Sequence, residues 1–233
     1  SESVVVNMTI RNNVQSIEGI IANAQQSSAL SSSDVTLICV SKYHSIDEAN
    51  TVYDAGVRHF AENRPEGFQE KSAAMADDIV WHLIGTLQTR KVKDVINEID
   101  YFHALDRIKL AKEINKRADK VIKCFLQVNV SGEESKHGIA PTEIAAFIEA
   151  VAEFPKVKIV GLMTMAPIDA SEEEIHGYFA NLRQLRDQVQ AMGKAYAPCQ
   201  HLSMGMSGDY PIAVAEGADF VRVGSAIFNT ETE

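Results

Sequence analysis

The feature that most constrains the fold is a series of eight short apolar runs that alternate with segments of helical character. The first run, VTLICVSK at residues 35–42, is rich in β-branched residues and stops at a lysine. Such runs are typical of strands that are buried on both faces of a parallel sheet covered by helices. The other expected strands cover residues 57–61, 79–84, 100–105, 121–130, 157–165, 199–204 and 220–224.

This alternation predicts an α/β protein built as a single (β/α)8 barrel of the TIM type. Tight, even strand spacing favours closure, and a chain of 233 residues suits one barrel, which typically has about 250. No linker rich in Pro, Gly or Ser divides the chain, so we expect one domain over residues 1–233. An open doubly wound sheet is the alternative.

An extra helix is expected ahead of the first strand. Apolar residues between 4 and 26 recur at helical spacing, as Ile10, Val14, Ile17 and Ile21 illustrate. Asp106 and Ser171 follow strands or turns and are candidate N-caps for later helices. The helices expected between the strands cover residues 46–55, 65–75, a segment reaching 96, 106–118, 141–153, 171–192 and 207–216.

Composition excludes several classes of function. The 22 basic and 32 acidic residues give a net charge of −10, which disfavours a general affinity for nucleic acid or anionic membranes. No apolar run approaches the roughly 20 residues of a membrane span, and the start lacks a signal sequence. Three widely spaced cysteines, Cys39, Cys124 and Cys199, indicate reduced core thiols, so we expect a cytoplasmic protein. The histidines lack metal-ligand spacing, so no metal site is expected.

Lys42 is the first candidate functional residue. In a closed barrel the carboxyl ends of the strands face the active site, so its amine would point at whatever the barrel binds. A neutral lysine amine can form a Schiff base with a ligand that carries a carbonyl group. The simpler interpretation is a lysine that extends along the sheet edge into solvent.

The ends of the last two expected strands resemble a phosphate site. Residues 203–209 (SMGMSGD) combine small residues, including Ser207, with the start of a helix, and Gly224 and Ser225 form a second small turn. Barrels often bind phosphate in these two loops. Arg222 lies two residues before Gly224 and shares its side of the strand, where it would enter the lumen or pair with Glu62.

Three further residues are weaker candidates. His82 lies on a buried strand, where a lone histidine is more often a core residue than a ligand. Asn63 directly follows the second strand and could bind a ligand hydroxyl or cap a turn. Lys136, in the loop after the fifth strand, is a candidate to close over a ligand, although a solvated lysine is the simpler interpretation.

Eight motifs spread over nearly the whole chain share one further property. They are residues 38–42 (ICVSK), 62–64 (ENR), 81–88 (WHLIGTLQ), 127–133 (QVNVSGE), 136–138 (KHG), 161–165 (GLMTM), 202–209 (LSMGMSGD) and 221–224 (VRVG). Together these motifs resemble the pyridoxal phosphate homeostasis protein family, whose fold is similar to the N-terminal barrel of alanine racemase. The chain departs from the family at Pro65-Glu66-Gly67 and at Arg90, which we expect to lie outside the cofactor's contacts.

The resemblance implies specific roles for residues of this chain. It implies that Lys42 forms the internal aldimine with pyridoxal 5′-phosphate and that Arg222 faces the pyridine nitrogen. It also suggests a monomer, and the partners we expect are pyridoxal phosphate and pyridoxal phosphate-dependent apoenzymes. The other residues implied in cofactor binding are Asn63, His82, Met204, Ser207, Gly224 and Ser225.

Arg222 disfavours strong catalysis. Pyridoxal phosphate is an effective electron sink when its pyridine nitrogen is protonated, and an arginine can only donate a hydrogen bond to that nitrogen. Racemisation would need a second acid or base, which we do not expect in the nine residues that follow Gly224. The preferred hypothesis is therefore a carrier that buffers and delivers the cofactor. The alternatives are a racemase-like enzyme of limited activity, a barrel acting on a phosphorylated sugar, and a structural barrel with an empty pocket.

Overall fold

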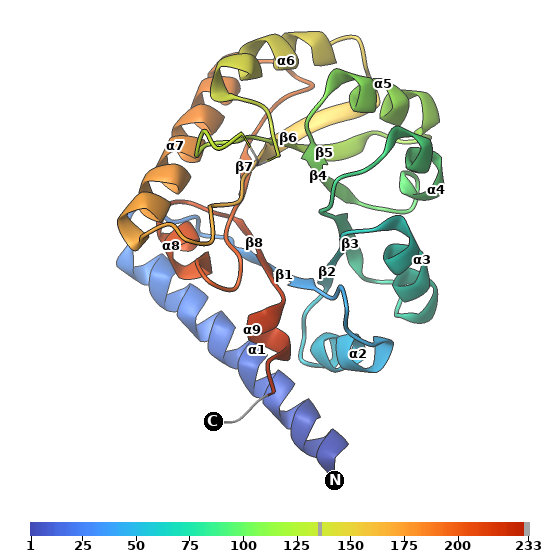
Figure 1. Ribbon diagram of the computed structural model, residues 1–233, viewed down its shortest axis with the longest axis vertical. Helices are drawn as coiled ribbons and strands as arrows, with labels where there is room; N and C mark the ends of the chain where they lie inside the picture. Colours follow the sequence, from blue (N-terminus) through green and yellow to red (C-terminus); the bar gives the residue numbers. More distant parts are fainter. Residues whose placement is uncertain (135–136, 231–233) are drawn as a thin grey trace.

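The computed structural model describes residues 1–134 and 137–230, and in it eight parallel strands close into a barrel in sequence order (Figure 1). Closure is complete because β1 pairs with β8 as well as with β2. The closed barrel predicted from the sequence is therefore confirmed, and the alternative of an open doubly wound sheet is wrong. The strands are β1 (Thr36–Val40), β2 (His59–Glu62), β3 (Val80–Leu83), β4 (Tyr101–Leu105), β5 (Ile122–Gln127), β6 (Val157–Met163), β7 (His201–Ser203) and β8 (Phe220–Val223).

Helices surround the barrel, and the N-terminal helix α1 (Glu2–Ser27) runs along its outside past α8 and α9 (Figure 1). Its buried stripe is Ile10, Val14, Ile17 and Ile21, as the helical spacing predicts. The other helices are α2 (Ile46–Asp54), α3 (Pro65–Ala74), α4 (Val92–Val95), α5 (Ile108–Arg117), α6 (Ile144–Val151), α7 (Glu172–Ala191), α8 (Tyr210–Ala215) and α9 (Ser225–Phe228), with short 3-10 turns η1 (Thr89–Lys91) and η2 (Pro141–Glu143).

Of the two predicted N-caps, Ser171 is confirmed and Asp106 is wrong. Ser171 caps α7 in a capping box with Glu174, as its position predicts. Asp106 is not a cap, because its carboxylate binds the Arg107 guanidinium at 2.9 Å and Arg107 itself takes the N-cap position of α5. The four-residue helix α9 after β8 is not anticipated from the sequence.

Two apolar clusters hold the barrel together. The larger one fills the space between the strands and the helices and includes Cys39, Cys124 and Cys199, which are all buried free thiols. The smaller one lies in the lumen and is built from Ile38, Val40, Ala61, Phe125, Val160, Met163 and Phe220. Polar side chains share this lumen, which makes the centre of the barrel unusual for a packed core.

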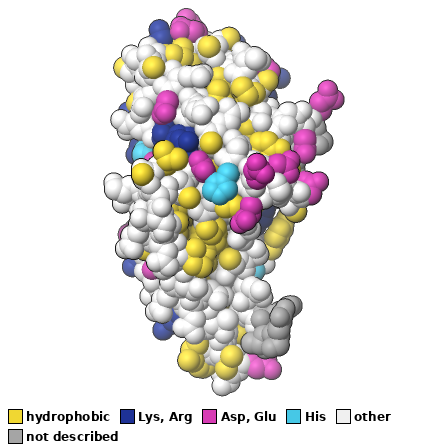
Figure 2. All heavy atoms as spheres, turned by 90° about the vertical axis from the view of Figure 1, so that its left-hand side faces the viewer, with side chains coloured by type: hydrophobic (Ala, Val, Ile, Leu, Met, Phe, Trp, Pro, Cys, Tyr) yellow, Lys and Arg dark blue, Asp and Glu magenta, His cyan; other side chains and the backbone are white. Residues whose placement is uncertain are grey.

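The outer surface reflects the acidic composition. Carboxylates gather on the face shown in Figure 2, and α7, which runs along that side, begins with exposed Glu172, Glu173 and Glu174. Acidic residues at this position stabilise the positive end of the helix dipole. In the described part of the chain, no helix has the length and apolar character needed to cross a membrane. Lys136 lies outside the described residues.

Candidate functional site

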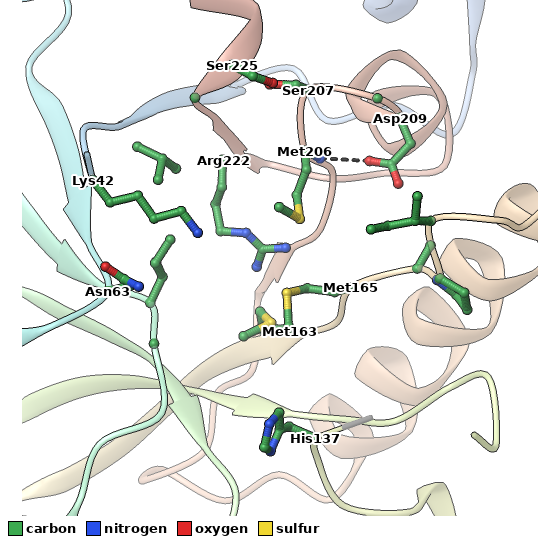
Figure 3. Close-up of a pocket in the computed structure, with 18 of the residues that line it drawn as sticks. Lys42, Asn63, His137, Met163, Met165, Met206, Ser207, Asp209, Arg222 and Ser225 are labelled. Atoms are coloured by element: carbon green, nitrogen blue, oxygen red, sulfur yellow. Dashed lines mark hydrogen bonds between the residues drawn. The ribbon is translucent and has the colours of Figure 1, made fainter. Parts of the chain in front are cut away.

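A cavity of about 580 Å³ opens at the carboxyl ends of the strands, within the size range of small-molecule sites (Figure 3). It brings together side chains that the sequence places far apart. The expected binding residues that line it are Lys42, Asn63, Ser207, Arg222, Gly224 and Ser225.

Lys42 extends from the end of β1 into this cavity, beside Asn63 from the end of β2 (Figure 3). The residue before it, Ser41, is fully buried and fixes the strand end, because its N–H donates to Ala61 O at 3.1 Å. The residue after it, Tyr43, adopts a left-handed backbone conformation with φ of 68° and is exposed. This turn directs the chain away from the barrel while the Lys42 side chain stays in the cavity.

A buried ion pair supports the strand end that carries Lys42. Lys71 Nζ on α3 lies 3.2 Å from Glu62 Oε2 and donates to Ser41 O at 3.1 Å. The Ser41 hydroxyl also donates to the Glu62 carboxylate. Glu62 therefore pairs with Lys71 and not with Arg222, so the predicted alternative of an Arg222–Glu62 pair is wrong.

Asn63 is positioned by a close approach of two loops. A Cβ atom added to Gly85, which follows β3, would lie 2.2 Å from Asn63 O. Only glycine leaves room for this contact, and Gly85 and Asn63 both line the cavity. The glycine at the end of β3 therefore decides where the Asn63 side chain lies.

Arg222 projects from β8 into the cavity and is 2 % exposed (Figure 3). Its guanidinium donates to Ser203 Oγ at 2.9 Å and to Thr164 O at 3.0 Å. Burial lowers the pKa of Arg222 to about 10, and the nearby Asp209 carboxylate opposes this effect. The group therefore stays cationic at neutral pH and cannot serve as a proton acceptor there.

The loops after β7 and β8 meet at the far side of the cavity. Ala226 N–H donates to Ser207 Oγ at 3.0 Å, which joins the two loops. A Cβ on Gly224 would lie 3.1 Å from Val40 O, so this turn packs closely on β1. Asp209 steadies the first loop by accepting from Met206 N–H at 2.7 Å, and burial raises the pKa of this carboxyl. Hydroxyl and backbone groups of this kind suit a phosphate.

Two of the expected binding residues lie elsewhere. Met204 is fully buried in the cluster between barrel and helices, because side chains alternate along the strand and its neighbour Ser203 takes the lumen side. His82 does face the lumen, but it lies one layer below the cavity. Ile84, two residues later on the same face, lines the cavity instead.

Several lining residues are not anticipated from the sequence. Met163, which also packs in the luminal cluster, lines the cavity, and so does Met165. Met206 and His137 line it as well (Figure 3). Met206 belongs to the motif that singled out Ser207, and four consecutive residues of that loop, 206–209, line the cavity, so membership of the motif is the signal that points to it.

The fold and the site define a class: a (β/α) barrel with a lysine at the end of its first strand, a cationic arginine beside it and a phosphate-type cradle opposite. Amine, guanidinium and cradle fit a phosphorylated aldehyde with an aromatic nitrogen, which is the chemistry of pyridoxal 5′-phosphate. A model of the alanine racemase N-terminal domain family matches residues 16–232. The chain belongs to this family, in the group of pyridoxal phosphate homeostasis proteins.

Individual relatives agree with this assignment. The pyridoxal phosphate homeostasis protein of Aquifex aeolicus is 43% identical over 180 residues, covering 76% of this chain and 78% of the relative. The protein of that name from Schizosaccharomyces pombe is 36% identical over 203 residues, covering 84% of each chain.

Solved structures agree as well. PipY of Synechococcus elongatus with pyridoxal phosphate bound is 32% identical, with a TM-score of 0.82 over 94% of this chain and 100% of PipY. Alanine racemase of Clostridium difficile, 16% identical with a TM-score of 0.73, covers 94% of this chain and 56% of the racemase, and shares the fold.

Proposed function

We propose that this protein holds pyridoxal 5′-phosphate in the cavity through an imine between Lys42 and the aldehyde of the cofactor. The observation that carries the proposal is that Lys42, Arg222 and the Ser207–Gly224–Ser225 turns line one cavity. In this arrangement Arg222 would face the pyridine nitrogen, Asn63 would contact the ring, and the two turns would hold the phosphate. PipY, a relative with pyridoxal phosphate bound, supports the choice of ligand.

The role we propose is to buffer and deliver the cofactor. A guanidinium cannot donate a full proton at neutral pH, so a facing pyridine nitrogen stays neutral and the cofactor is a weak electron sink. Delivery needs no redox step, because the amine of a recipient's lysine can replace Lys42 on the same carbon and release the Lys42 amine. We propose that recipients are pyridoxal phosphate-dependent apoenzymes and that the carrier is a monomer.

A racemase-like enzyme of limited activity is the second candidate. Racemisation needs an acid or base opposite the lysine. His137 and Asp209 are titratable residues that line the cavity with Lys42. Asp209 Oδ1 already accepts a hydrogen bond from Met206 N–H, so we choose His137 as the residue to test. Turnover of free amino acids that disappears in both Lys42→Ala and His137→Gln would favour the enzyme.

The deciding experiment is absorbance spectroscopy before and after borohydride reduction, followed by peptide mapping. Protein incubated with pyridoxal phosphate should show a Schiff-base band that reduction fixes on the peptide containing Lys42. Lys42→Ala should lose the band, whereas Lys194→Ala, which removes a surface lysine paired with Glu149, should keep it. No band in the wild-type protein, or label on other lysines alone, would refute the proposal.

A further inference from the structure

The lumen of the barrel contains a continuous series of hydrogen bonds that ends at Arg222. His59 Nδ1 lies 2.9 Å from His82 Nε2, and His82 Nδ1 lies 2.8 Å from His103 Nε2. His103 Nδ1 lies 2.8 Å from Ser203 Oγ, which also accepts from Arg222 at 2.9 Å. We call His59, His82, His103 and Ser203 the histidine column. It starts at the amino-terminal end of β2 and crosses the lumen from β4 to β7.

The donors and acceptors give this column one direction. Arginine only donates, so Ser203 Oγ accepts from Arg222 and keeps its own hydrogen to donate. In the described part of the chain, the acceptor within reach of that hydrogen is His103 Nδ1. A neutral His103 then carries its hydrogen on Nε2 and donates to His82 Nδ1, and His82 donates to His59 in the same way. The reverse direction would leave the Ser203 hydroxyl hydrogen without an acceptor among these residues.

The charges around the column favour neutral rings. Burial lowers the pKa of His82 well below its usual value, and the nearby His59 lowers it further. Burial, then His82 and Arg222, lower the pKa of His103. Burial also lowers the pKa of His59, which Asp100 opposes. A proton on His103 would place a second positive charge close to the Arg222 guanidinium, which disfavours a cationic ring at this position.

Packing fixes the planes of the two inner rings. His82 stacks on Tyr101 with ring centroids 4.8 Å apart and an interplanar angle of 8°. His103 stacks on Phe125 at 4.4 Å and 18°. Lys123 Nζ lies 5.1 Å from the centroid of the Tyr101 ring. Because neither ring can turn freely, the hydrogen bonds keep their order.

The geometry points to a positioning relay: the column presents the Ser203 oxygen to Arg222 and so sets the direction in which the guanidinium faces the ligand. The nitrogens are bonded pair by pair and do not converge on one point, which excludes a metal site as the purpose of the cluster. That Arg222 faces pyridoxal phosphate rests on the proposed function. The column itself does not.

The first test uses the ligand-free protein with ¹⁵N-labelled histidine. Long-range nitrogen–proton correlation NMR at pH 7.5 should show His59, His82 and His103 neutral, each with its hydrogen on Nε2. In Ser203→Ala the His103 Nδ1 signal should move toward that of a free acceptor nitrogen, and Ser203→Thr should restore it. A hydrogen on Nδ1 of His82 or His103, or a cationic ring, would overturn the relay.

The second test uses the loaded protein. Ser203→Ala should bind pyridoxal phosphate roughly tenfold more weakly, with a shifted absorption maximum, because Arg222 loses a charge-assisted hydrogen bond. Ser203→Thr should recover both values. His201→Gln is the matched control, since His201 also packs on Phe220 but lies outside the column. Wild-type affinity and spectrum in Ser203→Ala would overturn the relay. If the wild-type protein binds no pyridoxal phosphate, the proposed function fails and the NMR result alone decides the relay.

Discussion

Lys71 Nζ and Glu62 Oε2 lie 3.2 Å apart with both side chains more than nine-tenths buried. The pair joins α3 to the end of β2, and through Ser41 O, which accepts from Lys71 at 3.1 Å, it also holds the end of β1. Those two strand ends present Lys42 and Asn63 to the cavity. A buried ion pair is costly to form, so its position directly behind the candidate lysine suggests that it holds the site in shape.

Lys71→Met should destabilise the protein by about 3 kcal/mol, because it leaves the Glu62 carboxylate buried without its cation. The free energy of unfolding from urea titration at pH 7.5 measures this. Lys91→Met is the matched control. Lys91 also pairs with a glutamate, Glu66, but at the surface, where such pairs contribute about 0–1 kcal/mol.

The double variant Lys71→Met/Glu62→Leu separates the pair from the packing around it. It should recover a large part of the stability that Lys71→Met loses, since no unpaired charge remains. A double variant as unstable as the sum of the two single variants would show that the charge pair is not the cause.

Gly85→Ala should destabilise the protein and weaken pyridoxal phosphate binding together. The added Cβ would lie 2.2 Å from Asn63 O, so the loop that carries Asn63 must move. We expect a loss of about 1–3 kcal/mol in urea unfolding, typical of an overpacked site. Gly177→Ala in α7 is the control, because nothing lies within 4 Å of its Cβ position and alanine favours helix. Equal effects of the two variants would refute the role given to Gly85.

The buried histidines make stability depend on pH between about 4.5 and 6.5. Burial holds the pKa of His82 and His103 in the folded protein well below the unfolded value of about 6.5. Below pH 6.5 the unfolded chain therefore binds more protons, and the free energy of unfolding falls as pH falls. Each histidine contributes up to about 1.4 kcal/mol per pH unit in that range.

Urea unfolding at pH 7.5, 6.5 and 5.5 measures this slope. Carboxyls whose pKa is lowered in the folded protein, such as Glu48 and Glu216, reduce its stability only when the pH falls below about 4.5. They therefore do not contribute to the slope between pH 7.5 and 5.5. Asp209 acts in the opposite direction, because burial raises its pKa. A free energy of unfolding that stays constant from pH 7.5 to 5.5 would contradict neutral, buried histidines.

The barrel could be predicted from the sequence because its signal is local and repeated. Each strand is an apolar run, and the long helices α1 and α7 carry their own signals, the apolar spacing of α1 and the Ser171 cap of α7. The exact ends of the helices were harder to predict. Asp106 resembles an N-cap, but an adjacent Arg107 takes its carboxylate, which only the three-dimensional arrangement reveals.

The sequence allowed us to predict which strand ends carry the site residues, but not the depth in the lumen at which each side chain lies. Alternation along one strand tells which residues share a face, but not how deep in the lumen each lies. His82 and Ile84 share a face, yet Ile84 reaches the cavity and His82 binds His59 and His103 below it. The histidine column joins residues up to 100 positions apart, so no spacing in the sequence announces it.

Ser207→Ala tests the phosphate cradle, and a pair of ligands makes the test specific. The Ser207 hydroxyl accepts from Ala226 N–H at 3.0 Å and lines the cavity, so its loss should both loosen the joined loops and remove a donor to phosphate. Equilibrium titration should show roughly tenfold weaker binding of pyridoxal phosphate, the cost of about one hydrogen bond to a charged group. Pyridoxal, which has the same aldehyde and ring but no phosphate, should bind the variant and the wild-type protein equally. If both ligands weaken alike, Ser207 supports the shape of the pocket as a whole, and the phosphate lies elsewhere in the cavity.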